Sequence, residues 1–455
     1  MNTPVLIIGK MKDTPHILLV NPWIHDFAAY DFWSKPIGLL YLASILRNHD
    51  CRVSYIDCLD RFHPQAPAVD TPARFGRGSF LKTRIAKPTV FSDLPRNYSR
   101  YGIAEPWFRE DLRSLPKPDI ILVTSLMTYW YRGVQETIKI LKALYPDVSL
   151  LLGGIYATLC HRHASEHSGA DRVIKGAGEN RLLDLVREYT GFAVKPRFDP
   201  EDLDTYPYPA FDLQYKINYV PLLTSRGCPF SCTYCASHIL SSKRMLRNPL
   251  RVVKEIEFWH KRHAVDDFIF YDDALLVDAE RHAIPLFEEI LQAGLNIRFH
   301  TPNAIHIRGI TPKTARLMWQ TGFKTIRLGL ETATFENRDE LDAKVNAQDF
   351  KRAVSNLRDA GFQKNQIGAY LLVGLPGQAM DSITDSIKIV KQNRITPVLA
   401  YYSPIPNTAI WDKAVACSRY DLAADPIYTN NTVLPCQSET FSWETISYLK
   451  NLAAA

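Results

Sequence analysis

Three cysteines stand close together in the stretch "TSRGCPFSCTYCAS" (224–237): Cys228, Cys232 and Cys235, spaced C-x3-C-x2-C. Three thiolates can hold three irons of a [4Fe–4S] cube and leave the fourth iron open, whereas a pure electron carrier normally closes that corner with a fourth cysteine. A zinc site would need a fourth ligand at a recognised spacing, and none stands nearby. The motif therefore favours an iron–sulfur cluster with one open iron over zinc or chance clustering.

Three other groups of residues could also do chemistry. The stretch "CHRHASEHSG" (160–169) holds His161, His163 and His167, but on a helix the three histidines do not share one face, so we expect surface or ligand-edge histidines rather than zinc ligands. Cys417 and Cys436 are too few for a second cluster. The segment 73–100 is basic, and it is either a solvated loop or a site for phosphate, a carboxylate-rich ligand or nucleic acid.

The cysteine motif must be positioned by the elements around it. It follows the first of six short apolar strands that alternate with helical patterns, and such alternation predicts parallel β/α units. We expect the strands at residues 221–227, 267–273, 296–303, 325–331, 366–374 and 397–403. Six units predict a partial (β/α)6 TIM barrel, open on one side, with its chemistry at the C-terminal rim of the strands.

The N-terminal half also alternates strands and helices. Strands are expected at residues 16–22, 52–58, 118–125, 148–154 and 171–176, with helices near 38–50, 131–144, 156–166 and after 176. This pattern predicts a Rossmann-like, doubly wound parallel sheet, whose ligand binds at the carboxyl ends of the strands. Small residues at those ends would let a large flat ligand approach the backbone. No G-x-G-x-x-G follows the first strand, which disfavours a nicotinamide or flavin dinucleotide.

With these motifs in their order, residues 217–410 resemble the radical SAM superfamily. Members of that family bind S-adenosylmethionine at the open iron, split it reductively and obtain a 5′-deoxyadenosyl radical that takes hydrogen from the substrate. The matching segments are "YDD", "PNAIHI", "GLET", "GAYLLVGLPGQ" and "YYSPIPNT", where Asn407 replaces a glycine of the family pattern. The resemblance implies contacts to S-adenosylmethionine from Tyr234, Asn303, Glu331, Gly368, Tyr370, Tyr402 and Pro404. Read from the residues alone, Glu331 is also compatible with a barrel-interior carboxylate, and Asp272 and Asp273 with a helix cap.

Residues 14–190 resemble the cobalamin (B12)-binding domain found at the N-terminus of many radical SAM proteins. The matching pieces are "LLVNP", "PDIILVTSLMTYW", "LLLGGIYATL" and "VIKGAGEN", and the D-x-H-x-x-G signature of some cobalamin proteins is absent. The resemblance implies cobalamin contacts from Ser125, Met127, Thr128, Gly153, Gly154, Tyr156, Gly176, Ala177, Gly178 and Glu179. Such a sheet can also keep its shape after losing its ligand.

Length and composition suit an enzyme of two domains. The chain has 455 residues, 46% hydrophobic and 22% charged, with a net charge of +6. We expect a cobalamin-type domain at 1–194 with a long loop at 59–117, a proline-rich linker at 195–216, a radical SAM barrel at 217–410 and a short helical tail at 411–455. No apolar run reaches the ~20 residues of a membrane span, and the few cysteines suit a reducing compartment, so a cytoplasmic location is expected.

These observations leave three functions open. The first is a cobalamin-dependent radical SAM methyltransferase acting on an unactivated carbon or phosphorus centre of a small molecule or peptide, with a reductant such as flavodoxin or ferredoxin. The second is a radical SAM cyclase, rearrangement or coupling enzyme, with or without cobalamin. The third is a non-enzymatic iron–sulfur or cobalamin binding or sensing module. No appended RNA-binding module is seen, which disfavours a nucleic-acid substrate.

Overall fold

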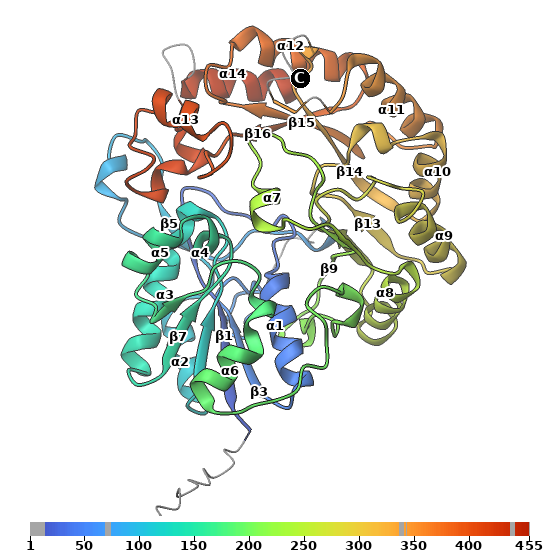
Figure 1. The fold of residues 1–455 in the computed structure, drawn as a ribbon. Coiled ribbons are helices and arrows are strands. Elements are labelled where there is room, and N and C mark those ends of the chain that lie inside the picture. The colour runs from blue at the N-terminus through green and yellow to red at the C-terminus, as the bar shows by residue number, and fades with distance from the viewer. Residues whose placement is uncertain (1–13, 69–73, 336–340, 343, 437–441, 455) are drawn as a thin grey trace, which may run out of the picture.

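The chain folds around two parallel sheets, as the computed structural model in Figure 1 shows. The structure describes residues 14–68, 74–335, 341–342, 344–436 and 442–454. Parts of the predicted first domain, basic segment and tail (residues 1–13, Ala73, 437–441 and Ala455) lie outside the described residues. The expected α/β class, a Rossmann-like domain followed by a partial barrel, is confirmed.

The N-terminal sheet has five parallel strands in the order β3-β1-β6-β7-β8. Its strands are β1 (His16–Asn21), β3 (Arg52–Asp57), β6 (Ile120–Val123), β7 (Ser149–Leu152) and β8 (Arg172–Val173). Helices α1 (Ile37–Asn48), α2 (Glu105–Ser114), α3 (Tyr131–Leu144), α4 (Ile155–Leu159), α5 (His161–His167) and α6 (Leu182–Thr190) cover it. The strand order reverses between β1 and β6, and in such sheets the ligand crevice lies at that reversal.

Both faces of this sheet are buried, which explains the apolar runs of its strands. In β1, Leu18 and Val20 pack into one hydrophobic cluster with residues of α2 and α3. Ile17 and Leu19 point the other way and pack with residues of α1 and α6. Because every side chain of β1 is buried, the strand is fixed at the centre of the domain.

The second sheet has six parallel strands in sequence order, from β9 to β16. They are β9 (Val220–Leu222), β12 (Asp267–Phe270), β13 (Arg298–His300), β14 (Phe323–Glu331), β15 (Ile367–Val373) and β16 (Thr396–Tyr401). The outer helices are α8 (Pro249–His263), α9 (Ala283–Ala293), α10 (Pro312–Gln320), α11 (Ala347–Asp359) and α12 (Met380–Gln392). Between β9 and α8 lie β10 (Ser225–Arg226), α7 (Ser237–Leu240) and β11 (Met245–Leu246).

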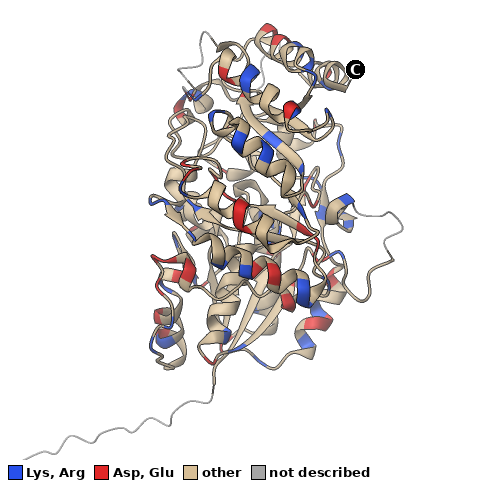
Figure 2. Cartoon of the chain, turned by 90° about the vertical axis from the view of Figure 1, so that its right-hand side faces the viewer, with Lys and Arg blue, Asp and Glu red and all other residues tan. Residues whose placement is uncertain are grey.

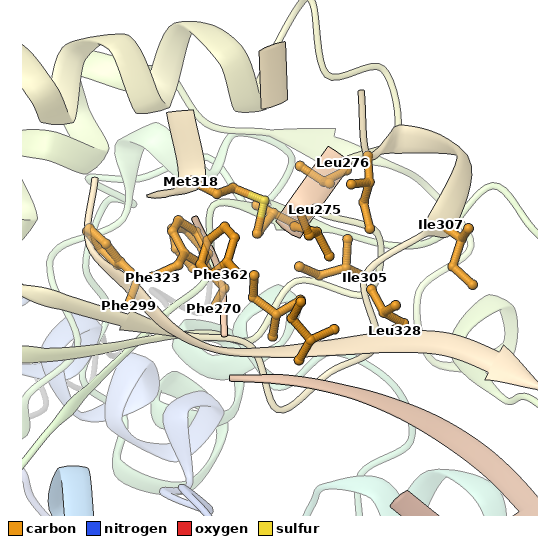
Figure 3. Packing of buried hydrophobic residues seen from close by; sticks show 14 of the residues in the cluster. Phe270, Leu275, Leu276, Phe299, Ile305, Ile307, Met318, Phe323, Leu328 and Phe362 are labelled. Atoms are coloured by element: carbon orange, nitrogen blue, oxygen red, sulfur yellow. The ribbon is translucent and has the colours of Figure 1, made fainter. Parts of the chain in front are cut away.

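Large apolar side chains fill the space between the barrel strands and their helices. Figure 3 shows Phe270, Phe299 and Phe323 packed beside Met318 in this layer. The rings of Phe270 and Phe323 are stacked, with centroids 5.5 Å apart. Since alternate residues of a strand point to opposite faces, the neighbouring positions of these strands face the barrel interior.

Local signals in the sequence fix where the barrel helices begin. Thr311 and Asn346 each form a capping box before α10 and α11, and the Asn248 side chain caps α8. Side-chain oxygens at these positions accept hydrogen bonds from backbone N–H groups that have no partner within the helix. The helices are therefore held in register with the strands that follow them.

The predicted loop 59–117 is more ordered than its length suggests. It contributes β4 (Lys82–Arg84) and β5 (Ser99–Tyr101), which form a small antiparallel sheet with β2 (Ile24–Asp26) in the order β2-β5-β4, and then α2. Antiparallel pairing across such a separation leaves no regular signal in one sequence, which is why the sheet was not anticipated.

The C-terminal tail contacts both domains. Helix α13 (Trp411–Cys417) follows the barrel, and α14 (Trp443–Ala454) packs on α12 and β16. Between them, Ile427 and Val433 are buried in a cluster of the N-terminal domain. Within the described residues, no helix is both long and apolar enough to cross a membrane.

Candidate functional site

The three cysteines lie in the loop between β10 and α7. Gly227, just before Cys228, has a φ of +84°, and a Cβ there would lie 2.6 Å from the Lys243 carbonyl oxygen, so the turn into the loop requires glycine. Cys232 is buried, whereas Cys228 and Cys235 are half-buried. The loop therefore presents its thiols from one short, tightly turned segment.

Lys344 supplies the charge that an anionic cluster needs. Burial raises the pKa of Cys232, while the hydrogen bond and the positive charge of Lys344 act to lower it. Burial alone would lower the pKa of Lys344, but its bond to Cys232 and the charges of Cys232, Glu331 and Asp342 raise it on balance. A thiolate is the form that binds iron, and a nearby ammonium stabilises it. The residues present thus fit an iron–sulfur cluster bound by three thiolates.

The cysteine loop closes the rim of the open barrel. The Thr233 backbone donates to the Leu341 carbonyl and accepts from the Ile410 N–H, both at 3.0 Å. Ile410 follows β16, the strand at the opposite edge of the sheet from β9. The strands leave a gap between these edges, and the loop bridges it at the C-terminal end.

The strand-end residues form a hydrogen-bonded network next to the cysteine loop. Buried Asp272 accepts from the hydroxyls of Thr224 (2.7 Å) and Ser225 (2.6 Å). Asn303 donates through Nδ2 to the Tyr271 carbonyl at 2.8 Å, and the Tyr370 hydroxyl donates to the Pro302 carbonyl at 2.8 Å. These bonds join the ends of β9, β12, β13 and β15, so three of the predicted rim segments share one edge.

Glu331 occupies a special backbone position. It has a φ of +61°, which is rare for a residue with a side chain, and the pairing of β14 with β15 shifts register between Gly329 and Glu331. A bulge of this kind re-aims a side chain, and backbone strain of this kind concentrates at functional sites. The Glu331 carboxylate is buried and its charge contributes to the raised pKa of Tyr234, after the larger effect of burial. Glu331 and Tyr234 therefore lie close together at the rim.

The segment after β16 reaches the same rim. Tyr402 packs in one hydrophobic cluster with Tyr234, and Pro404 is also buried. The Tyr402 hydroxyl is buried and has no hydrogen-bond partner among the described residues. Asn407 has a φ of +67°, so the turn survives the replacement of glycine, as expected. Cys436 joins this cluster, and the Cys417 and Cys436 thiols both lie near the Ala414 carbonyl.

The ends of the N-terminal strands present an open backbone edge. A Cβ on Gly153 or Gly176 would meet nothing within 4 Å, and Met127 is 47% exposed. Gly154 differs, because a Cβ there would lie 2.2 Å from the Ser125 carbonyl oxygen. The open glycines fit a flat ligand close to the backbone, and Gly154 lets the ends of β6 and β7 pack together.

Other residues predicted to contact cobalamin are engaged within the protein. The Ser125 hydroxyl donates to the Gly153 carbonyl at 2.6 Å, and Thr128 bonds Thr429 of the tail at 3.1 Å. Tyr156 is fully buried in the core, with its hydroxyl 2.8 Å from Nδ1 of His163. The structure thus puts the Tyr156 side chain behind the strand ends rather than at their edge, because its helix turns it inward. Ala177 and Gly178 stay half-buried at the edge.

The two edges face each other. Helix α4 lies against α7, the short helix that follows Cys235, and Figure 1 shows α7 between the two domains. Arg226, before the cysteines, forms an ion pair with Glu179 at 2.5 Å. Glu179 is therefore a contact between the domains in this structure. The strand ends of one sheet open toward the cysteine loop of the other.

Sequence reasoning missed the residues that fill the lower barrel. Trp33 and Phe75 come from the N-terminal domain and pack on His300 of β13, with ring centroids 4.8 Å and 4.6 Å apart. The Trp33 indole donates to the Phe75 carbonyl at 2.8 Å. We name Trp33, Phe75 and His300 the barrel floor. Only their aromatic character was visible in the sequence, because the contact joins segments far apart in the chain.

The histidines of 160–169 border a pocket of about 470 Å³ between α5 and the tail. His163 is held by Tyr156, and its pKa is lowered by burial. Within the described residues, no three His, Cys, Asp or Glu side chains are arranged to hold a single metal ion.

Two family models match the chain. The model of the Radical SAM superfamily matches residues 222–390, and that of the B12 binding domain matches residues 103–186. The first match contains the cysteine loop and the strand ends from β12 to β15. The second contains the strand ends from β6 to β8.

Several known proteins are similar to this chain over most of its length. An uncharacterized methyltransferase of Pyrococcus horikoshii is 25% identical over 410 residues, covering 84% of this chain and 78% of the relative. An anaerobic magnesium-protoporphyrin IX monomethyl ester cyclase of Rubrivivax gelatinosus is 26% identical, covering 72% of this chain and 63% of the relative. Among solved structures, the radical S-adenosylmethionine methyltransferase TsrM of Kitasatospora setae has a TM-score of 0.67 at 14% identity, covering 96% of this chain and 89% of that one.

Proposed function

Because this chain belongs to the radical SAM superfamily and carries a B12-binding domain, we propose that it is a cobalamin-dependent radical SAM methyltransferase. The substrate would offer an unactivated carbon or phosphorus centre. One observation carries the proposal: the open glycine edge of the first sheet faces the cysteine loop of the second across α4 and α7. A methyl donor at one edge and a radical source at the other would both reach a substrate bound between them.

Each cofactor supplies a separate part of this chemistry. A [4Fe–4S] cluster with bound S-adenosylmethionine supplies the hydrogen-abstracting radical, and cobalamin supplies the methyl group. The chain's own residues bind and shield these groups. Cys228, Cys232 and Cys235 would hold the cluster, and Lys344 would stabilise their thiolates. Tyr234, Asn303, Glu331, Gly368, Tyr370, Tyr402 and Pro404 are proposed to line the S-adenosylmethionine site.

The open glycines at the strand ends support the proposed cobalamin edge. Met127, Gly153, Gly176, Ala177 and Gly178 would contact the ligand. Ser125, Thr128, Gly154, Tyr156 and Glu179 would hold that edge in shape through the bonds and packing described above. A soluble one-electron donor of the flavodoxin or ferredoxin class is proposed as the reductant.

Single replacement of Cys228, Cys232 or Cys235 by Ala tests the central assignment. We expect each variant, reconstituted anaerobically with iron and sulfide, to lose the visible absorption of the cluster and the formation of 5′-deoxyadenosine, because three thiolates are the minimum set for the cube. Cys417→Ala is the matched control and should keep both. A Cys232→Ala protein that still cleaves S-adenosylmethionine would refute the assignment.

A second candidate function is a radical cyclisation without methyl transfer, which the similarity to a cyclase favours. Product mass separates the two, because methyl transfer adds one methyl group and consumes two molecules of S-adenosylmethionine. Reconstitution with cobalamin and its ultraviolet–visible spectrum then shows whether the B12-binding domain is loaded.

A further inference from the structure

Three arginines converge above the barrel floor. Arg327 lies on β14 at an interior position, and its guanidinium lies 3.1 Å from where a Cβ of Gly368 would be. Arg77 stacks over Trp33, with its Cζ 4.6 Å from the ring centroid, and Arg74 lies over Phe75 at 5.5 Å. Two of the three therefore come from the N-terminal basic segment and one comes from the barrel.

The geometry of the two segments holds these arginines in place. Gly78 and Asp31 form a backbone bridge, and Asp31 accepts from the Tyr219 hydroxyl at 2.7 Å. Buried Arg61 pairs with Asp31 at 3.1 Å and also bonds the Gly76 carbonyl. Hydrogen bonds thus hold the segment 74–78 to Asp31, and the bond from Tyr219 holds Asp31 next to the start of β9.

The arginines carry positive charge without a carboxylate to balance it. Among the described residues, none of the three forms an ion pair with Asp or Glu, although 22 of every 100 residues of the chain are charged. Burial lowers the pKa of Arg77 and of Arg327, and the neighbouring arginines lower both further. By contrast, Figure 2 shows acidic and basic residues interspersed along the outer helices. The three positive charges lie near one another, and no carboxylate among the described residues neutralises them. A bound anion would therefore stabilise this arrangement.

The interior face of the barrel is less deeply buried above the floor than at it. Thr325 and His300 are buried at the level of the floor, whereas Arg327, Gly329 and Tyr370, higher on the same interior face, are only half-buried. Arg327 is four residues before Glu331 on β14, so the cluster lies below Glu331 on the same wall and borders Gly368 of the proposed S-adenosylmethionine site. Exposed Tyr30 and Phe32, whose rings are 4.5 Å apart, lie on the segment that carries Trp33.

We infer that Arg74, Arg77 and Arg327 bind a phosphate or phosphonate group of the substrate. Guanidinium groups match such oxyanions with paired N–H donors, and three of them suit a dianion better than a single carboxylate. This inference rests on the proposed function, because it names the class of substrate that the radical site would act on. A bound oxyanion would fix the rest of the substrate at one height below the rim.

Binding of simple anions to the reconstituted full-length protein tests the inference. Inorganic phosphate, methylphosphonate and acetate are titrated separately at constant ionic strength by calorimetry. We expect phosphate or methylphosphonate to bind more tightly than acetate. Arg77→Gln or Arg327→Gln should weaken that binding about tenfold, or about 1.4 kcal/mol, because each removes a charged hydrogen-bond donor. Arg84→Gln is the matched control, because Arg84 is exposed in the same basic segment, and it should change binding less than about twofold.

Other outcomes overturn the inference. Equal binding of phosphate by the wild type and Arg77→Gln would show that the cluster holds no anion, and tighter binding of acetate would assign it to a carboxylate. If Arg327→Gln weakens the binding of S-adenosylmethionine as much as the binding of phosphate, the arginines belong to the S-adenosylmethionine site. Arg74→Gln, at an exposed position, provides a variant with little effect on folding. Formation of 5′-deoxyadenosine in the same samples separates this test from that of the proposed function, since it requires no substrate anion.

Discussion

Asp57, at the carboxyl end of β3, is a half-buried acid at the edge where the first sheet meets the barrel. Burial raises its pKa to about 6, and the charge of Asp60 adds to this, while hydrogen bonds from Asn21 and Leu59 act in the opposite direction. A raised pKa means that the folded state holds the proton more tightly than the unfolded chain does. Stability from this residue is therefore present below about pH 4 and lost as pH rises through about 6.

Asp57→Asn makes this effect measurable. Relative to the variant, the wild type should lose about 3 kcal/mol of unfolding free energy between pH 4 and pH 7, because two units of pKa correspond to about that amount. Urea denaturation at four pH values in this range measures the difference. A difference between Asp57→Asn and the wild type that stays flat across this pH range would contradict the raised pKa.

At the scale of elements, the neighbouring glycines after β7 have different roles. Gly154 has a φ of +97° and no room for a Cβ, so Gly154→Ala should lower the unfolding free energy by about 2 kcal/mol or more. Gly153 has open space around it, so Gly153→Ala should leave stability unchanged and weaken cobalamin binding by filling the edge. Denaturation and cobalamin titration of both variants measure this. Unchanged cobalamin affinity in Gly153→Ala would remove Gly153 from the proposed site.

Most elements of the two sheets could be predicted because their strands are short apolar runs ended by small or polar residues. The helix expected at 131–144 is α3 over the same residues, and the turn at Asn407 follows from the tolerance of Asn for positive φ. The single helix expected at 156–166 is instead the pair α4 and α5, separated at Cys160. Periodicity does not reveal a break of one residue when both halves remain helical.

The candidate site was only partly accessible to sequence reasoning. The order of residues along the chain places strand ends on a common edge, so the cysteine loop, Glu331 and Gly153 could be found. It does not say which side chain turns inward, as Tyr156 does, nor that Arg77 lies near enough to Arg327 to influence its charge. The placement of Tyr156 depends on how its short helix packs against Tyr131 and His163. The placement of Arg77 depends on the packing of segments far apart in the chain, which no local pattern encodes.

At the scale of the whole molecule, Asn430 anchors the tail to the first domain. Its side chain donates to Asp26 at 2.9 Å, and both residues are almost fully buried. Asn430→Ala leaves a buried carboxylate with one donor fewer, which should cost about 1–3 kcal/mol. Hydrogen exchange should then rise in residues 425–434 and stay unchanged in β14 and β15.

Asn431→Ala is the control for this prediction, since the neighbouring Asn431 is only half-buried. Amide hydrogen exchange in this variant should match that of the wild type. Equal exchange in Asn430→Ala and the wild type would mean that the packing of Ile427 and Val433 alone holds the tail.

The barrel floor limits how the protein can be divided or recombined. His300 belongs to the barrel, yet the rings that cover it belong to the first domain, so a barrel produced without that domain would expose an aromatic surface to water. An exchange of N-terminal domains between relatives must carry suitable partners for His300 as well as a cobalamin edge. The two domains must therefore evolve together. A change in residues 74–78 that suits a new substrate also changes how the first domain packs on the barrel.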